Sequence, residues 1–219
     1  MNSPLIQLLV LAGIAVFLIL RLKNVLGTRE GFEQPPEPKP LNDRLDRSDL
    51  EVIEGGPDLD IIDHVDEGSD AAHALAEMKR LEPSFSVADF LQGARGAYEM
   101  IVMGYENGDL AKIQPFLSED IYDSFVDGVA AREDQGLTIE SEFIGVRELK
   151  LVDATFDADT KEAELSIRFV AELTSAVRDQ GGDIVEGSLT EVKRQKDTWS
   201  FARTMGADDP NWLLVSTDA

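Results

Sequence analysis

The spacing of apolar residues changes at Gly136, and this change limits the chain to one class of fold. Upstream, in SVADFLQGARGAYEMIVMGYENGD (residues 86–109), apolar side chains recur every third or fourth residue, which is typical of an amphipathic helix. Downstream, in KEAELSIRFVAELTSAVRD (161–179), they alternate with polar and charged residues, which indicates a strand with one buried face. Helices followed by strands predict an α+β domain, with the helices covering one face of a curved antiparallel sheet of about four strands.

Capping and turn-forming residues divide these two regions into elements. Ser86 is expected to cap the long helix, Asn107–Gly108 to end it, and Ser118 to begin another amphipathic helix after a short one. Turn-rich segments at 157–160 and 180–183 separate the strands as hairpins. We therefore expect strands over 138–156, 161–178, 184–203 and 211–217.

The last residues, GADDPNWLLVSTDA (206–219), predict a turn that leads into the last strand. Asp209 can accept backbone N–H bonds, Pro210 fixes φ for a turn, and Asn211 tolerates the next turn position. The apolar residues that follow are expected to pair with DTWSFAR (197–203). In that arrangement Trp199, Phe201 and Trp212 share a core.

An apolar run near the N-terminus predicts a membrane anchor. From residue 4 to residue 20 the only polar side chain is Gln7, and the apolar residues up to 26 bring the helix to the roughly 20 residues that span a bilayer. Basic residues follow the run instead of preceding it, unlike in a cleaved signal peptide. These residues, Arg21, Lys23 and Arg29, place the C-terminal flank in the cytoplasm by the positive-inside rule. We expect residues 1–28 to form a single-pass signal anchor with its N-terminus outside.

Residues 29–83 are predicted to be an acidic, proline-rich linker. Residues 30–82 hold 16 acidic and 5 basic side chains and include the cluster EQPPEPKP, which favours an extended and mostly disordered chain. Within this stretch, SDAAHALAEMKRLEP predicts a helix over 69–81 that Ser69 caps. That helix either packs on the domain of residues 84–219 or binds a partner, and packing is the interpretation we prefer.

Composition excludes several kinds of chemistry. A net charge of −23 disfavours nucleic acid as a partner. The chain has no cysteine, and His64 and His73 both fall in the linker, so a Cys–His or Ser–His catalytic system cannot form within the domain. DADTKEAE (157–164) begins like a calcium loop, but Glu162 and Arg168 replace the glycine and the bidentate glutamate of such a loop. We therefore predict no metal, no cofactor and no enzymatic activity.

Two interpretations of the domain remain. In the first it binds proteins, because some of its large aromatic residues must close the core while others line a groove between the first long helix and the sheet. In the second it is an enzyme or small-molecule binder that uses a carboxylate and a tyrosine in an apolar pocket. The candidate apolar binding surface comprises Phe90, Tyr98, Tyr105, Phe169, Trp199, Phe201 and Trp212.

Four stretches resemble, in order and spacing, the Tim44-like domain of bacterial TimA-type adaptors: FLQGARGAYEMIV, REDQG, DTWSFAR and DDPNWLLVSTDA. The apolar N-terminal run, the LGTREGFE after it and the acidic linker are also similar to those bacterial members. The resemblance implies a cone-shaped α+β domain similar to nuclear-transport-factor-two-like folds, with an apolar pocket between helices and sheet.

The same resemblance implies a membrane-tethered adaptor or scaffold at the bacterial inner membrane, in protein translocation or membrane-protein assembly. The mitochondrial relative of the family is a peripheral inner-membrane subunit that tethers a DnaK-type chaperone at the import channel. Translocation or chaperone components are therefore the expected partners. This chain differs from that relative in carrying a predicted anchor in place of a long basic N-terminal region.

Overall fold

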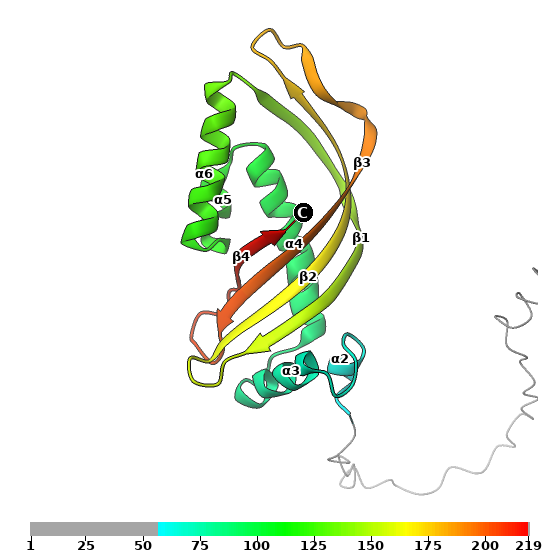
Figure 1. The fold of residues 1–219 in the computed structure, drawn as a ribbon, viewed down its shortest axis with the longest axis vertical. Helices are drawn as coiled ribbons and strands as arrows, with labels where there is room; N and C mark the ends of the chain where they lie inside the picture. The colour runs from blue at the N-terminus through cyan, green and yellow to red at the C-terminus, as the bar shows by residue number, and fades with distance from the viewer. Residues whose placement is uncertain (1–56, 219) are drawn as a thin grey trace, which may run out of the picture. The chain divides into compact units, whose positions relative to one another are not determined.

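A computed structural model describes residues 57–218 of the chain (Figure 1). The predicted anchor, with its flanking Arg21, Lys23 and Arg29, and the first part of the predicted linker lie outside these residues. Within the described part of the chain, no helix is both long enough and apolar enough to cross a bilayer.

Helices come first along the chain and strands follow. The helices are α2 (Leu59–Ile62), α3 (Asp70–Leu81), α4 (Val87–Glu106), α5 (Leu110–Ile113), the 3-10 turn η1 (Gln114–Phe116) and α6 (Glu119–Asp134). The strands are β1 (Thr138–Phe156), β2 (Glu162–Arg178), β3 (Ile184–Thr204) and β4 (Leu213–Asp218). They form one antiparallel sheet in the order β1-β2-β3-β4, and α4 lies on its concave side (Figure 1). The predicted α+β fold, with helices on one face of a curved four-stranded sheet, is confirmed.

The alternating residues of β2 decide which face of the sheet the helices cover. Leu165, Ile167 and Phe169 are all fully buried, whereas Arg168 between them is exposed. Along the pairing of β1 with β2, the register shifts at three places, at 143–145, 146–148 and 151–153. Such irregularities bend a strand and increase its twist, which accounts for the curvature of the sheet.

Helix α4 packs its apolar stripe on the concave face of the sheet. The Tyr98 ring stacks on Phe169 with ring centroids 4.4 Å apart and planes 16° apart, and it contacts Trp199 at 4.5 Å. The helix begins and ends as predicted: Ser86 Oγ accepts from the Asp89 N–H, Asn107 follows the last helical residue, and Gly108 has a φ of 73°.

The C-terminal turn holds Asn211 outside the last strand. Asp209 Oδ1 accepts from both the backbone and the side-chain nitrogen of Asn211, at 2.9 and 2.8 Å, so β4 starts at Leu213 and not at 211 as predicted. The strand pairs with β3 as expected, with Trp199 opposite Thr217 and Phe201 opposite Leu214. Trp212 is half-buried against Phe85 and Phe90, with centroid distances of 6.0 and 4.8 Å.

Two helices that precede residue 84 pack into the same core. In α3, which Ser69 caps, the side chains of Leu75 and Met78 are fully buried. The short α2, which the periodicity of the sequence does not predict, buries Ile61. We therefore propose that the folded unit begins near residue 57.

A fragment of residues 57–219 is expected to be more stable than a fragment of residues 84–219. The shorter fragment loses the burial of Ile61, Leu75 and Met78, which stabilise by roughly 1.5–3 kcal/mol each, so its free energy of unfolding should fall by at least about 4 kcal/mol. Urea unfolding monitored by circular dichroism measures the difference. Equal midpoints would support the boundary at 84 that the sequence suggested.

Asp60 joins α2 to the start of α4. Its carboxylate accepts from the backbone nitrogens of Val87 and Ala88 at 2.8 and 2.9 Å, and from Lys79 Nζ at 2.8 Å. Burial by itself would raise the pKa of this carboxyl, but the hydrogen bonds from Lys79, Ala88 and Val87 outweigh it and lower the pKa to about 2. An anionic side chain at a helix N-terminus also interacts favourably with the helix dipole.

The lowered pKa of Asp60 predicts an acid-dependent loss of stability. Ionised Asp60 contributes its full stabilisation above pH 4, and the contribution of about 2 kcal/mol is lost as the pH falls from about 4 to about 2. The Asp60→Asn protein should be less stable at pH 7 and should lose less stability on acidification over this window. Thermal unfolding between pH 2 and pH 7 measures both effects. Glu67→Gln, in the exposed loop before α3, is the control and should follow the unmodified protein.

Candidate binding site

A cavity of about 280 Å³ opens on the concave side of the sheet, and we call it the central cleft. Residues of α4, α6, β3 and the end of β4 line it, and Figure 1 shows the C-terminal end of the chain reaching this side of the sheet. Its volume lies just below the roughly 300–1,000 Å³ that is usual for small-molecule sites. The lining residues are Ile101, Val102, Tyr105, Glu106, Ser124, Phe125, Gln195, Asp197, Trp199, Thr217 and Asp218.

An aromatic pair forms the wall of the central cleft between α4 and α6. The rings of Tyr105 and Phe125 lie 4.7 Å apart, and the Arg132 guanidinium lies 5.4 Å above the Tyr105 ring. Arg132 Nη2 also donates to the Tyr105 carbonyl oxygen at 2.9 Å. A Cβ atom at Gly128 would lie 2.6 Å from the Tyr105 hydroxyl, so the missing side chain of this glycine is what lets α6 approach the ring.

A buried polar group forms the floor. Asp197 is only 6% exposed, and its Oδ2 accepts from the Tyr98 hydroxyl and from Gln195 Nε2, the latter at 2.9 Å. Burial, together with the hydrogen bond to the Asp197 carboxylate and its charge, raises the pKa of Tyr98 well above its usual range. The tyrosine therefore stays neutral and acts as a hydrogen-bond donor to the aspartate.

A second carboxylate stands at the end of α4. Glu106 Oε2 accepts from Ser141 Oγ on β1 at 2.6 Å and from Ser175 Oγ on β2 at 3.1 Å. These two bonds attach the C-terminal end of α4 to the sheet. With Asp197 and Asp218, Glu106 gives the central cleft three carboxylates, whereas its lining contains no lysine, arginine or histidine.

Of the seven aromatic residues predicted from the sequence, the structure brings two to the central cleft, Tyr105 and Trp199. Tyr98 lies beneath its floor as the donor to Asp197, and Trp212 is half-buried near the other end of α4. The remaining residues, Phe90, Phe169 and Phe201, are buried in the core.

Sequence reasoning missed the polar groups of the central cleft, Glu106, Gln195 and Asp197, and the α6 side chain Phe125. One signal for Asp197 was present. It follows the same alternation as Trp199 and Phe201 on β3, and a carboxylate in phase with two buried rings must find partners inside the domain. No comparable signal exists for Glu106, because its partners come from two strands distant in sequence.

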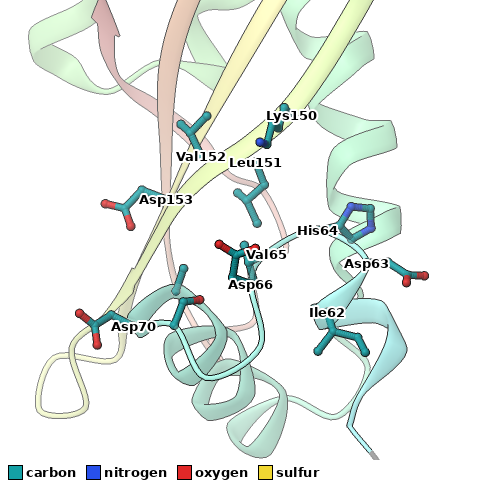
Figure 2. A pocket seen from close by; sticks show the side chains of 12 residues that line it. Ile62, Asp63, His64, Val65, Asp66, Asp70, Lys150, Leu151, Val152 and Asp153 are labelled. Carbon is teal, nitrogen blue, oxygen red and sulfur yellow. The ribbon is translucent and has the colours of Figure 1, made fainter. Parts of the chain in front are cut away.

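A second hollow, of about 590 Å³, lies between the loop that joins α2 to α3 and strand β1. Figure 2 shows Leu151 pointing from β1 toward Val65 and Asp66 of that loop. The acidic residues around this hollow, Asp63, Asp66, Asp70 and Asp153, are exposed, and within the part of the chain that the structure describes no group of His, Asp or Glu side chains is arranged to hold a metal ion. The central cleft, with its buried and hydrogen-bonded groups, is the better candidate.

Comparison with known proteins assigns the fold to a family. Residues 71–219 match the family described as the Tim44-like domain. The chain belongs to this family. The Tim44-like match begins within α3.

Individual relatives of the Tim44-like chain are distant. It is 20% identical over 152 residues to mitochondrial import inner membrane translocase subunit TIM44-1 of Arabidopsis thaliana, a match that covers 67% of this chain and 32% of that protein. The chain thus spans about a third of the length of this relative. Among solved structures, the intermembrane space region of the chloroplast protein ARC6 aligns with a TM-score of 0.41 and 13% identity, over 58% of this chain and 94% of that one.

Tyr98→Phe is expected to destabilise the Tim44-like domain by about 1.5–3 kcal/mol. The substitution keeps the ring that stacks on Phe169 but removes the donor to a buried carboxylate, which then lacks one hydrogen bond. Urea unfolding measures the loss. Tyr122→Phe is the matched control, because the Tyr122 ring is half-buried and its hydroxyl makes no hydrogen bond among residues 57–218. Equal effects of the two substitutions would show that the bond to Asp197 does not stabilise the fold.

Proposed function

We propose that this Tim44-like protein is a membrane-tethered adaptor that binds other proteins through its central cleft. The observation that carries the proposal is the arrangement of half-buried rings, Tyr105 and Phe125, beside the carboxylates of Glu106, Asp197 and Asp218 in an open cavity. Aromatic residues that are accessible in a concave site are typical anchors for a partner. The family supports this role, since its relative is named a subunit of an inner membrane translocase.

The tether in this proposal is the predicted anchor of residues 1–28, with the domain on the cytoplasmic side of a bacterial inner membrane. Residues 29–56 would connect the anchor to the domain. A flexible chain of this length has a root-mean-square reach of about 30 Å, and repulsion between its acidic residues extends it further. The domain would then reach translocation or chaperone components at the same membrane.

One observation favours the alternative of an enzyme or small-molecule binder: a carboxylate and a tyrosine do lie together, as Asp197 and Tyr98. The geometry argues for a structural role of this pair. Tyr98 is fully buried and its pKa is raised, so its hydroxyl neither reaches a substrate nor releases a proton near neutral pH. Binding of a protein partner therefore accounts better for the central cleft.

Site-specific photo-crosslinking in membranes tests the adaptor proposal. A photoreactive amino acid at Tyr105 or Ser124, both in the lining of the central cleft, is expected to give defined protein adducts. The matched control is Val126, which is 37% exposed on the same helix α6 but does not line the cavity. Adducts at Val126 equal to those at Tyr105 would contradict the proposal. Adducts only at His73 or Ala76, on the exposed side of α3, would move the binding site to that helix.

A further inference from the structure

We infer that the central cleft receives a positively charged side chain of the partner, the guanidinium group of an arginine. This inference rests on the proposed adaptor function and names the chemistry that the cleft recognises. It follows from the charge of the lining, from the unused oxygens of two carboxylates and from the aromatic wall.

The charge of the central cleft has one sign. Its three carboxylates come from three different elements, Glu106 on α4, Asp197 on β3 and Asp218 on β4, and no cationic side chain belongs to the lining. A small concave site with carboxylates of one sign attracts a cation and repels phosphate or carboxylate ligands. The cleft therefore disfavours an anionic lipid headgroup.

Two of these carboxylates each keep one oxygen available. Both hydrogen bonds to Asp197 go to Oδ2, and both hydrogen bonds to Glu106 go to Oε2. Within residues 57–218, Asp197 Oδ1 and Glu106 Oε1 accept no hydrogen bond. Asp197 is more than nine-tenths buried and lines the cavity, so its free oxygen is an acceptor that a ligand or water in the central cleft can satisfy.

The aromatic wall selects arginine over lysine. A guanidinium is planar, stacks on aromatic faces and presents several N–H groups in a fixed fork, whereas an ammonium is a compact and strongly hydrated charge. Arg132, which lies outside the lining, already makes such a contact with the Tyr105 ring within the chain, and the lining offers the rings of Phe125 and Trp199 as well. A cavity of about 280 Å³ holds one long side chain and not a folded segment. An arginine between apolar residues would place its guanidinium near the carboxylates and its neighbours at the rim.

The test uses the full chain in detergent micelles and an acetylated, amidated Leu-Arg-Leu peptide as the probe. The chain has two tryptophans, and only Trp199 lines the central cleft, so its indole N–H signal in nitrogen-15 NMR reports on the site while Trp212 serves as an internal reference. We expect the peptide to shift the Trp199 signal in a saturable manner. The same peptide with citrulline, which is neutral and has nearly the same shape, should bind at least about tenfold more weakly.

Variants of the protein show which carboxylates bind the arginine peptide. Asp197→Asn should weaken binding of the arginine peptide at least about tenfold, because it neutralises the buried acceptor. Asp218→Asn, at an exposed position of the lining, should weaken it about threefold without loss of folding, which keeps the test decisive if the Asp197 variant unfolds. The control is Asp127→Asn, an equal change of charge on α6 outside the lining, for which binding should stay within twofold.

Equal affinity for the arginine and citrulline peptides, or equal effects of Asp218→Asn and Asp127→Asn, would overturn the inference. Agmatine tests whether the guanidinium belongs to a protein partner or to a small molecule. If agmatine binds as tightly as the peptide, the assignment to a side chain of a protein partner is wrong. The adaptor proposal and the arginine inference fail in different ways. Protein adducts at Tyr105 in membranes, without selective binding of the arginine peptide, would support the adaptor proposal and reject the arginine inference. Selective binding of the arginine peptide, without protein adducts in membranes, would reject the adaptor proposal.

Discussion

The contact of Tyr98 with the sheet organises the domain. Its ring stacks on Phe169 of β2, and its hydroxyl donates to the buried carboxylate of Asp197 on β3. These two contacts together fix both the rotation of α4 about its axis and its height above the sheet. Beyond Tyr98, toward the C-terminal end of α4, side chains of α4, α6, β3 and β4 surround the central cleft.

The two ends of α4 differ in how they pack against the rest of the domain. At its N-terminal end, Asp60 caps the helix, and the rings of Phe85, Phe90 and Trp212 fill the space to the sheet. Arg203 pairs with Glu82 and lies 5.3 Å above the Trp212 ring, which ties the turn before β4 to the end of α3. This end is a packed core. The C-terminal end is held by polar bonds from Glu106 to two serines, and it is the end that stays open.

The position of this open end connects the family with the proposed function. The Tim44-like match covers α3 to the end of β4, so the packed end and the central cleft both belong to the family domain. The acidic lining of the cleft agrees in sign with the net charge of −23 of the whole chain. A chain with this net charge repels anionic surfaces and attracts basic segments, in keeping with the arginine-bearing partner proposed for the central cleft.

The sequence by itself determined the elements and their order. The change of period at Gly136, the caps Ser69, Ser86 and Ser118 and the turns between strands are local properties of the chain, and the structure has each of them where the pattern placed it. The short α2 was missed because four residues carry almost no periodic signal.

Only the tertiary structure decided which aromatic residues are core and which line a site. Tyr98 and Tyr105 share one stripe of α4, and Trp199 and Phe201 share one face of β3, so periodicity assigns all four to the same buried side. What separates Tyr98 from Tyr105 is the set of neighbours each one meets: Phe169 and Trp199 of the sheet enclose Tyr98, whereas Tyr105 packs on Phe125 of α6 beside the central cleft. These neighbours come from elements distant in the sequence, so no local period carries the distinction.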